Sequence, residues 1–193
     1  MPAQIDVLLP VYNTARYLRT SLESIRDQTF SDFRVLIIDD GSTDESRDIA
    51  AAFAAEDSRF ELIALPHRGL VETLNHGLDL VTAPIVARQD ADDISVPGRF
   101  AIELAFLEHN PDVCAVSGCY FDMDRHGLPT SINRWPTRMP PADPFAIPAS
   151  EPYLSHPFLM LRTEAIRAIS GYRHIRHSED ADLYWRLTLY GRI

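Results

Sequence analysis

The chain has 193 residues, 46% of them hydrophobic, which is enough for one substantial core and short for two separate domains. Its 28 acidic and 18 basic residues give a formal net charge of -10, which argues against a nucleic-acid-binding surface because such surfaces collect basic residues. The sequence has neither a signal-peptide pattern nor an apolar run of membrane-spanning length, so we expect no transmembrane segment.

Short apolar runs alternate with amphipathic stretches through the first half of the chain. Strands are predicted at residues 5–9, 35–38, 60–64 and 85–87, and helices at residues 16–27, at 70–80 and from Pro97 to about 109. Ser42 and Glu45 have the spacing of a capping box, which predicts a further helix that runs to about residue 56. This alternation is typical of an α/β fold with a mostly parallel central sheet flanked by helices.

The second half of the chain is less regular. We expect strands at residues 113–121 and 158–161, a helix at 163–170 closed by Gly171, and a last helix that begins near Asp180. Six prolines within residues 134–152 exclude a helix or a central strand and predict a long loop there. The whole chain, residues 1–193, is expected to form one domain.

The two cysteines, Cys114 and Cys119, fall within the strand predicted at residues 113–121. Their odd spacing places them on opposite faces of a strand, so they cannot form a disulfide there. Two unpaired thiols fit a reducing compartment, and neither their number nor their spacing indicates a zinc site. We therefore expect a cytoplasmic protein, either free or attached peripherally at the inner face of the membrane.

Acidic residues stand at three predicted element boundaries: Asp39 and Asp40 after the second strand, residues 90–93 after the fourth strand, and Glu179 with Asp180 before the last helix. Because the carboxyl ends of parallel strands share one edge, the first two clusters should line one crevice. Gathered carboxylates repel one another, and Mg2+ or Mn2+ would neutralise them and bridge a diphosphate. Taken singly, each cluster also fits an ordinary turn, a helix cap or a favourable helix-dipole contact.

Four short segments follow one another in a fixed order, namely residues 7–13 (VLLPVYN), 35–44 (VLIIDDGSTD), 90–93 (DADD) and 178–180 (SED). In this order they resemble the motifs of family 2 glycosyltransferases of the GT-A fold, and the resemblance extends from Ile5 to about Leu189. It implies a metal-dependent, inverting transferase that moves a sugar from a nucleoside-diphosphate sugar, with a UDP-sugar favoured. The acceptor would be a hydroxyl of a glycan or a lipid-linked glycan in bacterial polysaccharide or cell-envelope synthesis.

The resemblance also implies which residues bind the donor nucleotide. Pro10, Tyr12 and Asp40 match the contacts to the base, with Tyr12 stacking on the ring and Asp40 accepting a hydrogen bond from a ring N–H. Asp39 matches the first acid of the same pair, either in donor binding or in a structural role.

The remaining motif residues match the metal site and the catalytic groups. Asp90 and Ala91 belong to the segment that contacts the ribose and diphosphate, and Asp92 matches the ligand of Mn2+ or Mg2+. Asp180 matches the catalytic base, and Glu179 matches the partner that binds or orients the acceptor. An ionised carboxylate would take the proton of the attacking hydroxyl while the cation offsets charge on the leaving diphosphate.

Several further side chains have both a functional and a structural interpretation. Arg68, beside His67, is a candidate phosphate contact and equally fits a solvated loop. His156 either faces the site or is a structural histidine. Trp135 and Tyr153 either stack on a sugar acceptor or hold the proline-rich loop against the core.

Family members usually continue with further helices beyond the position of Ile193, so we expect the chain to be truncated, and an exposed apolar edge would allow a homodimer. Three other functions compete with the transferase. A nucleotidyltransferase is disfavoured because the turn at residues 10–16 contains no glycine, and an oxidoreductase is disfavoured because no G-x-G-x-x-G follows the first strand. A non-catalytic nucleotide-sugar-binding module stays open.

Overall fold

The computed structural model describes residues 2–133, 152, 154–175 and 178–193. The strands are β1 (Ile5–Val11), β2 (Phe33–Asp39), β3 (Phe60–Ala64), β4 (Ile85–Arg88), β5 (Ala115–Val116), β6 (Tyr120–Met123), β7 (Pro129–Asn133) and β8 (Met160–Arg162). The helices are α1 (Ala15–Arg26), α2 (Ser46–Glu56), α3 (Leu70–Leu80), α4 (Arg99–His109), α5 (Thr163–Ala168), α6 (Glu179–Thr188) and the short 3-10 helix η1 (His156–Phe158).

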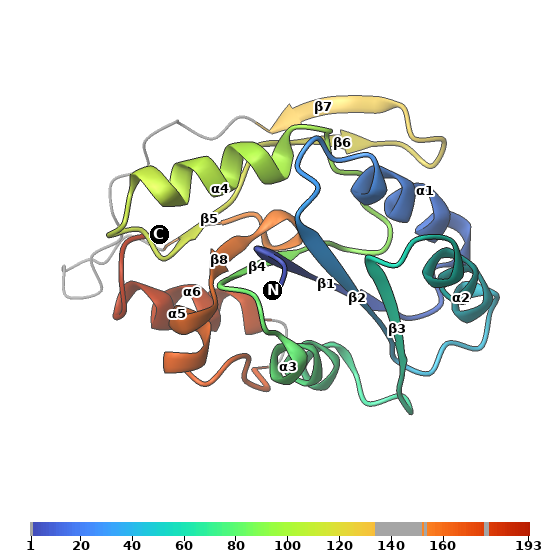
Figure 1. The fold of residues 1–193 in the computed structure, drawn as a ribbon, viewed down its shortest axis with the longest axis horizontal. Coiled ribbons are helices and arrows are strands. Elements are labelled where there is room, and N and C mark those ends of the chain that lie inside the picture. Colours follow the sequence, from blue (N-terminus) through green and yellow to red (C-terminus); the bar gives the residue numbers. More distant parts are fainter. Residues whose placement is uncertain (1, 134–151, 153, 176–177) are drawn as a thin grey trace.

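The central sheet has the strand order β3-β2-β1-β4-β8-β5 (Figure 1). Strand β1 pairs in parallel with both β2 and β4, and β2 pairs in parallel with β3. Strand β8 runs antiparallel between β4 and β5. The prediction of a mostly parallel sheet is confirmed. Strands β2 and β3 are added on one side of β1, and β4 is then added on its other side.

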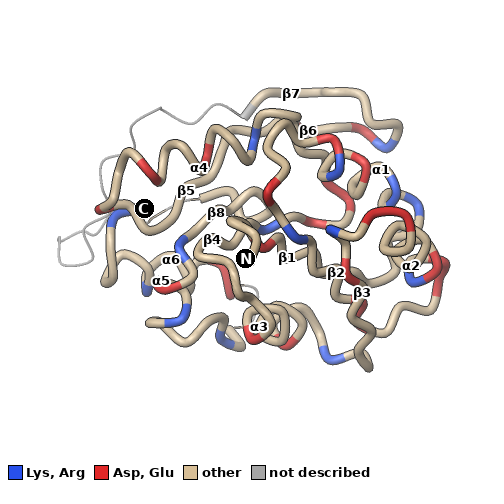
Figure 2. Tube along the Cα trace, in the orientation of Figure 1, with Lys and Arg blue, Asp and Glu red and all other residues tan. Residues whose placement is uncertain are grey.

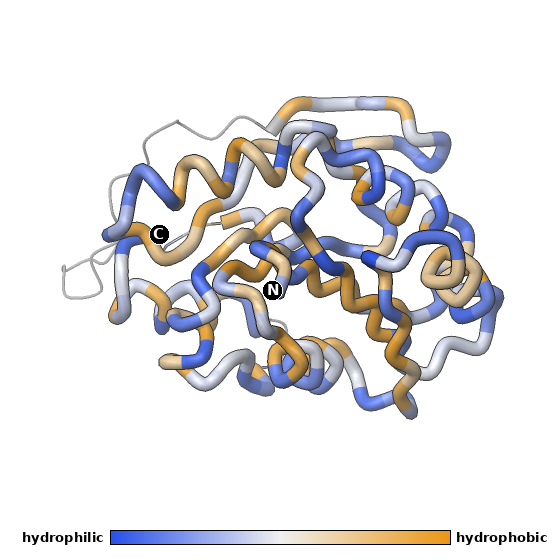
Figure 3. The backbone as a smooth tube through the Cα atoms, in the orientation of Figure 1, coloured by the Kyte–Doolittle hydropathy of each residue, from blue (hydrophilic) through white to orange (hydrophobic). Residues whose placement is uncertain are grey.

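Helices cover both faces of the sheet, so that the fold has three layers (Figure 1). Val35 and Ile37 of β2 belong to a core cluster with α1, α2 and α4, whereas Leu36 and Ile38 belong to a second cluster with α3, α5 and α6. A strand buried on both faces needs apolar residues at successive positions, which explains the uninterrupted apolar run in this segment. Figure 3 shows the apolar part of the trace running along the central strands.

The capping-box prediction is wrong. Helix α2 begins at Ser46, with Glu45 at the N-cap position and no side-chain hydrogen bond at that cap. The hydroxyl oxygen of Ser42 instead accepts a hydrogen bond from the amide of Asn13 at 3.1 Å. The carboxylate of Asp44 accepts the amide of Ser46 at 3.0 Å. The hydroxyl of Ser42, which the predicted capping box required, is therefore bound to the turn after β1 instead.

The single strand predicted at residues 113–121 is also wrong, because the segment is divided between two sheets. Strand β5 lies at the edge of the central sheet, and β6 forms an antiparallel hairpin with β7. Between them, the hydroxyl of Ser117 accepts the amide of Ser155 at 2.8 Å. Both cysteines are free, with Cys114 buried and Cys119 exposed, so the expectation of unpaired thiols is confirmed.

Charges of both signs are spread over the described residues. Figure 2 shows basic residues scattered along the trace and interleaved with acidic ones. Within the described residues, no helix has the length and apolarity needed to cross a bilayer.

Asp6 of β1 is a fully buried acid that connects three strands. Its carboxylate accepts hydrogen bonds from Nε and Nη2 of Arg34 on β2, both at 2.9 Å, and from the amides of Thr82 at 2.6 Å and Ala83 at 3.0 Å ahead of β4. Burial alone would raise the pKa of Asp6, but these hydrogen bonds outweigh it and lower the pKa below its usual 3.8. The stability that this carboxylate contributes is therefore present above about pH 4 and is lost as the pH falls further.

We expect Asp6→Asn to lower the free energy of unfolding by about 2–3 kcal/mol near pH 7, because a neutral amide loses the charged hydrogen bonds. Urea unfolding measures the difference, which should shrink as the pH falls below about 4. Asp27→Asn is the control, since that exposed carboxylate pairs with the exposed Arg26 at the surface. Equal losses in the two variants would contradict the framework role of Asp6.

Candidate active site

Loops after β1, β2 and β4 meet at the carboxyl edge of the parallel strands. Strand β1 has β2 on one side and β4 on the other, which makes this edge the kind of switch point beside which open α/β sheets bind their ligands. Pro10 lies near the end of β1, in register with Ile38 of β2. Tyr12 follows directly after β1, Asp40 directly after β2, and Ala91 is buried in the loop after β4.

The turns after β1 and β2 are bound to each other. Asn13 has a φ of 53°, a left-handed conformation that asparagine adopts more readily than most residues. Its Oδ1 accepts hydrogen bonds from the amides of Thr43 at 2.8 Å and Asp44 at 3.3 Å. In return, the carboxylate of Asp44 accepts the amide of Ala15 at 3.0 Å. The turns after β1 and β2 therefore form one hydrogen-bonded unit, which fixes the position of the backbone at Tyr12.

Asp39 lies behind the crevice. Its carboxylate is fully buried and accepts the amide of Ser42 at 3.2 Å and Nε of Arg47 at 2.8 Å. These contacts tie the end of β2 to the first turn of α2. Asp39 has no exposed surface in this arrangement, and a role for it in donor binding stays a prediction.

Asp40 organises the loop that follows β3. Its two carboxylate oxygens accept the amides of Arg68 at 2.8 Å and Gly69 at 2.9 Å. Nδ1 of His67 lies 2.8 Å from the same carboxylate. Asp40 thereby attaches the loop after β3 to the loops after β1 and β2.

His67 and Tyr12 form an aromatic platform at this edge. Their ring centroids are 4.2 Å apart and their planes are inclined by 19°. A Cβ at Gly41, where φ is +72°, would lie 2.7 Å from the backbone nitrogen of His67, so glycine permits the close approach. The stacking partner of Tyr12 was not recognised from the sequence, because the contact joins loops that are remote along the chain.

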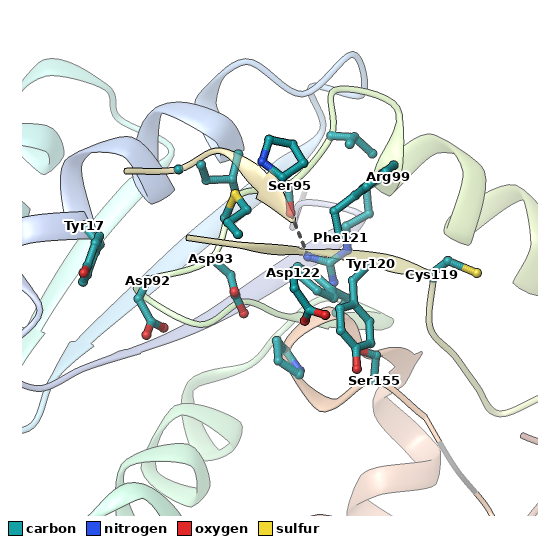
Figure 4. Close-up of a pocket in the computed structure, with 18 of the residues that line it drawn as sticks. Tyr17, Asp92, Asp93, Ser95, Arg99, Cys119, Tyr120, Phe121, Asp122 and Ser155 are labelled. Carbon is teal, nitrogen blue, oxygen red and sulfur yellow. Dashed lines mark hydrogen bonds between the residues drawn. The ribbon is translucent and has the colours of Figure 1, made fainter. Parts of the chain in front are cut away.

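The loop after β4 gathers three carboxylates, and we call residues 90–93 the acid loop. Ligand oxygens of Asp90, Asp92 and Asp93 all lie within 4.8 Å of one another. Figure 4 shows Asp92 and Asp93 side by side, with their carboxylates directed to the same side. Burial, followed by the negative charges of Asp90 and Asp92, raises the pKa of Asp93 to about 6.

Arg88 supplies positive charge directly beneath this cluster. Its side chain is buried, and Nη2 lies 2.6 Å from Oδ1 of Asp90. Within the described residues, its Nε and Nη1 have no hydrogen-bond partner. The guanidinium thus forms a direct ion pair with the first acid of the loop, and its charge also acts on Asp93.

A cavity of about 1140 Å³ opens beside the acid loop (Figure 4). Asp92 and Asp93 line it from one side, and Asp180, in the first turn of α6, also lines it. Its other walls come from α1, the start of α4, the β6–β7 hairpin and residues 154–158. Glu179 begins α6 and is not among the lining residues. The hairpin wall was not predicted from the sequence.

His156 also lines the cavity, and it is held as a neutral group. Its Nε2 lies 3.0 Å from the hydroxyl of Tyr172. Burial, with the nearby charge of Arg88, lowers the pKa of His156 to about 2. A group with so low a pKa is a weak proton acceptor near neutral pH.

The structure brings together some of the predicted site residues and separates others. Asp92 and Asp180 share the cavity, whereas Asp40 and Tyr12 are not among its lining residues and lie on the loops after β2 and β1. Almost all of the loop predicted at residues 134–152 lies outside the described residues, as do Trp135 and Tyr153.

The chain is similar to known glycosyltransferases over most of its length. The model of the family described as Glycosyl transferase family 2 matches residues 6–170. EpsE of Bacillus subtilis (strain 168) is 34% identical over 188 residues, which cover 95% of this chain and 66% of EpsE. AmsE of Erwinia amylovora, an amylovoran biosynthesis glycosyltransferase by name, is 29% identical over 191 residues, which cover 96% of this chain and 70% of AmsE.

Solved structures share the fold. The mannosyltransferase PcManGT from Pyrobaculum calidifontis, in complex with GDP-Man and Mn2+, has a TM-score of 0.76 at 19% identity and covers 100% of this chain. TarS 1-349 of S. aureus in complex with UDP-GlcNAc has a TM-score of 0.72 at 19% identity and covers 96% of this chain. The predicted GT-A fold is confirmed. This chain spans 54% and 53% of those two structures.

We expect Asn13→Ala to lower the free energy of unfolding by about 2 kcal/mol, because the amides of Thr43 and Asp44 lose their acceptor and alanine is strained at this φ. Chemical denaturation measures the effect. Asn110→Ala is the control, since its half-buried side chain donates a hydrogen bond to one helical carbonyl, that of Phe106. A loss no larger than that of the control would show that Asn13 does not bind the two turns together.

Proposed function

Because this chain belongs to glycosyl transferase family 2, we propose that it transfers a sugar from a nucleoside-diphosphate sugar to an acceptor hydroxyl, with inversion at the anomeric carbon. One observation carries the proposal: Asp92 of the acid loop and Asp180 of α6, remote in sequence, line one cavity. We assign the diphosphate to the side of Asp92, the proton acceptor to Asp180, and the acceptor substrate to the space between them.

A divalent cation fits the acid loop. Asp90, Asp92 and Asp93 offer hard oxygen ligands within 4.8 Å of one another, which is the donor type that Mg2+ and Mn2+ take. The complex of PcManGT with Mn2+ and GDP-Man supports the same class of cofactor and donor. We assign Asp92 as a ligand of Mn2+ or Mg2+, and a bound cation would offset the charge that develops on the leaving diphosphate.

The donor nucleotide is assigned to the loops beside the cavity. The exposed ring of Tyr12, backed by His67, offers a stacking face for the base, and we assign Pro10 and Asp40 to the same base site. Asp90 and Ala91 would face the ribose and diphosphate. TarS with UDP-GlcNAc and PcManGT with GDP-Man differ in their base, and our assignment favours uridine.

Asp180 is assigned as the base of a direct displacement. The acceptor oxygen attacks the anomeric carbon, the bond from that carbon to the diphosphate oxygen breaks, and Asp180 takes the hydroxyl proton. Glu179, its neighbour at the start of α6, is assigned to binding or orienting the acceptor. The name of AmsE connects that relative with polysaccharide synthesis, which supports a glycan or lipid-linked glycan as the acceptor here.

We expect UDP or GDP to raise the melting temperature only when Mn2+ is present, because the diphosphate needs the cation to bind beside the acid loop. Asp92→Asn should remove this metal-dependent shift, and Asp48→Asn, at an exposed site on α2, should retain it. NAD serves as the unrelated nucleotide. An equal shift with and without Mn2+ would contradict the metal site, and binding of UDP-sugars without release of UDP would indicate a binding module.

Asp180→Asn should lower the turnover of the donor and acceptor pair by about 10² to 10⁴, while the dissociation constant of the donor changes little. Asp182→Asn is the matched control, since it lies in the first turn of the same helix and pairs with Arg186. Release of the nucleoside diphosphate measures turnover, and calorimetry measures donor binding. Wild-type turnover in Asp180→Asn would exclude this residue as the base.

A further inference from the structure

A buried polar network lies beneath the acid loop, and no sequence motif singled out its members. Gln89 has no exposed surface, while Ser95, Arg99 and Glu103 retain 4%, 6% and 4%. Burying four polar side chains together is unfavourable unless their donors and acceptors are paired. The way in which they are paired therefore shows what the network holds in place.

The side-chain amide of Gln89 spans the acid loop from the inside. Its Nε2 donates to the backbone carbonyls of Asp90 at 3.3 Å and Asp93 at 2.9 Å. Its Oε1 accepts hydrogen bonds from Oγ of Ser95 at 2.6 Å and Nη1 of Arg99 at 3.0 Å. The amide thus sets the backbone positions of the first and last acids of the loop.

Arg99 fastens the chain on both sides of the acid loop. Nη2 donates to the carbonyl of Arg88 at 2.8 Å, ahead of the loop, and Nη1 donates to Oγ of Ser95 at 3.0 Å, after it (Figure 4). Nε donates to Oε2 of Glu103 at 3.1 Å, one helical turn along α4. The guanidinium also lies 5.4 Å from the ring centroid of Phe158, in the cavity wall.

These contacts oppose the electrostatic repulsion that would move the carboxylates of the acid loop apart. Three carboxylates within 4.8 Å of one another repel, and an unanchored loop would turn them apart. Anchors at the first and last acids, and on the chain just before and after the loop, hold the backbone while the side chains stay crowded. A planar guanidinium can make these contacts at once, and a lysine ammonium cannot reproduce its geometry.

We propose that Gln89 and Arg99 are positioning residues that hold Asp90, Asp92 and Asp93 in the arrangement required to bind a divalent cation. The inference rests on the metal site proposed above. In this proposal the buried network sets the positions of the metal ligands. The affinity for the metal therefore depends on residues that do not touch it.

The experiment measures the dissociation constant of Mn2+ for the full chain from the EPR signal of free Mn2+. Arg99→Lys replaces the planar guanidinium, with its several N–H donors, by a single ammonium group. Gln89→Met removes the side-chain amide and leaves the side-chain volume nearly unchanged. Arg186→Lys is the matched control, because Arg186 is similarly buried, pairs with Asp182 at 2.7 Å and donates to two backbone carbonyls far from the acid loop along the chain. Thermal unfolding of each variant measures the accompanying loss of stability.

We expect Arg99→Lys and Gln89→Met to weaken Mn2+ binding by about 10- to 100-fold, and Arg186→Lys to bind as the wild type does at a comparable loss of stability. Wild-type affinity in the first two variants, or equal weakening in all three, would overturn the positioning role. If Arg99→Lys fails to fold, Gln89→Met decides the matter. Absence of Mn2+ binding by the wild type would instead overturn the metal site itself.

Discussion

Mutual repulsion of Asp90, Asp92 and Asp93 is the constraint that the surrounding structure has to meet. Their oxygens are held within 4.8 Å of one another at the end of a parallel strand. Arg88 compensates the first carboxylate, and Gln89 and Arg99 fix the backbone from below. Such a group of crowded oxygen ligands fits a divalent cation, because the positive charge of the ion would relieve the repulsion.

Parallel pairing explains why the acid loop lies near the rest of the site. Strand β1 pairs with both β2 and β4, so their loops emerge at one edge of the sheet. Hydrogen bonds between Asn13 and the turn at Thr43 lock two of these loops together, and Asp40 attaches the loop after β3. The proposed donor side is therefore built by loop contacts, whereas α6 and the hairpin build the proposed acceptor side.

Burial separates acids that perform different tasks in this chain. Asp6 and Asp39 have no exposed surface, and arginine side chains together with backbone amides satisfy their oxygens. Asp92 and Asp180 line the cavity and can meet a ligand. A carboxylate whose acceptors are all taken stabilises the fold, while one that faces a cavity is available to a cation or a proton.

The sequence by itself determined the α/β class, the main strands and helices, and the order of the motifs that identify the family, because apolar periodicity and short-range spacing are written along the chain. Tertiary structure decided what each of the adjacent acids Asp39 and Asp40 holds in place: Arg47 binds the carboxylate of Asp39, and backbone amides of the loop after β3 bind that of Asp40. It also bound the hydroxyl of Ser42 to the turn after β1 instead of to a helix cap, and it divided the segment at residues 113–121 between two sheets. Those outcomes depend on contacts between remote segments, and local propensity contains no information about them.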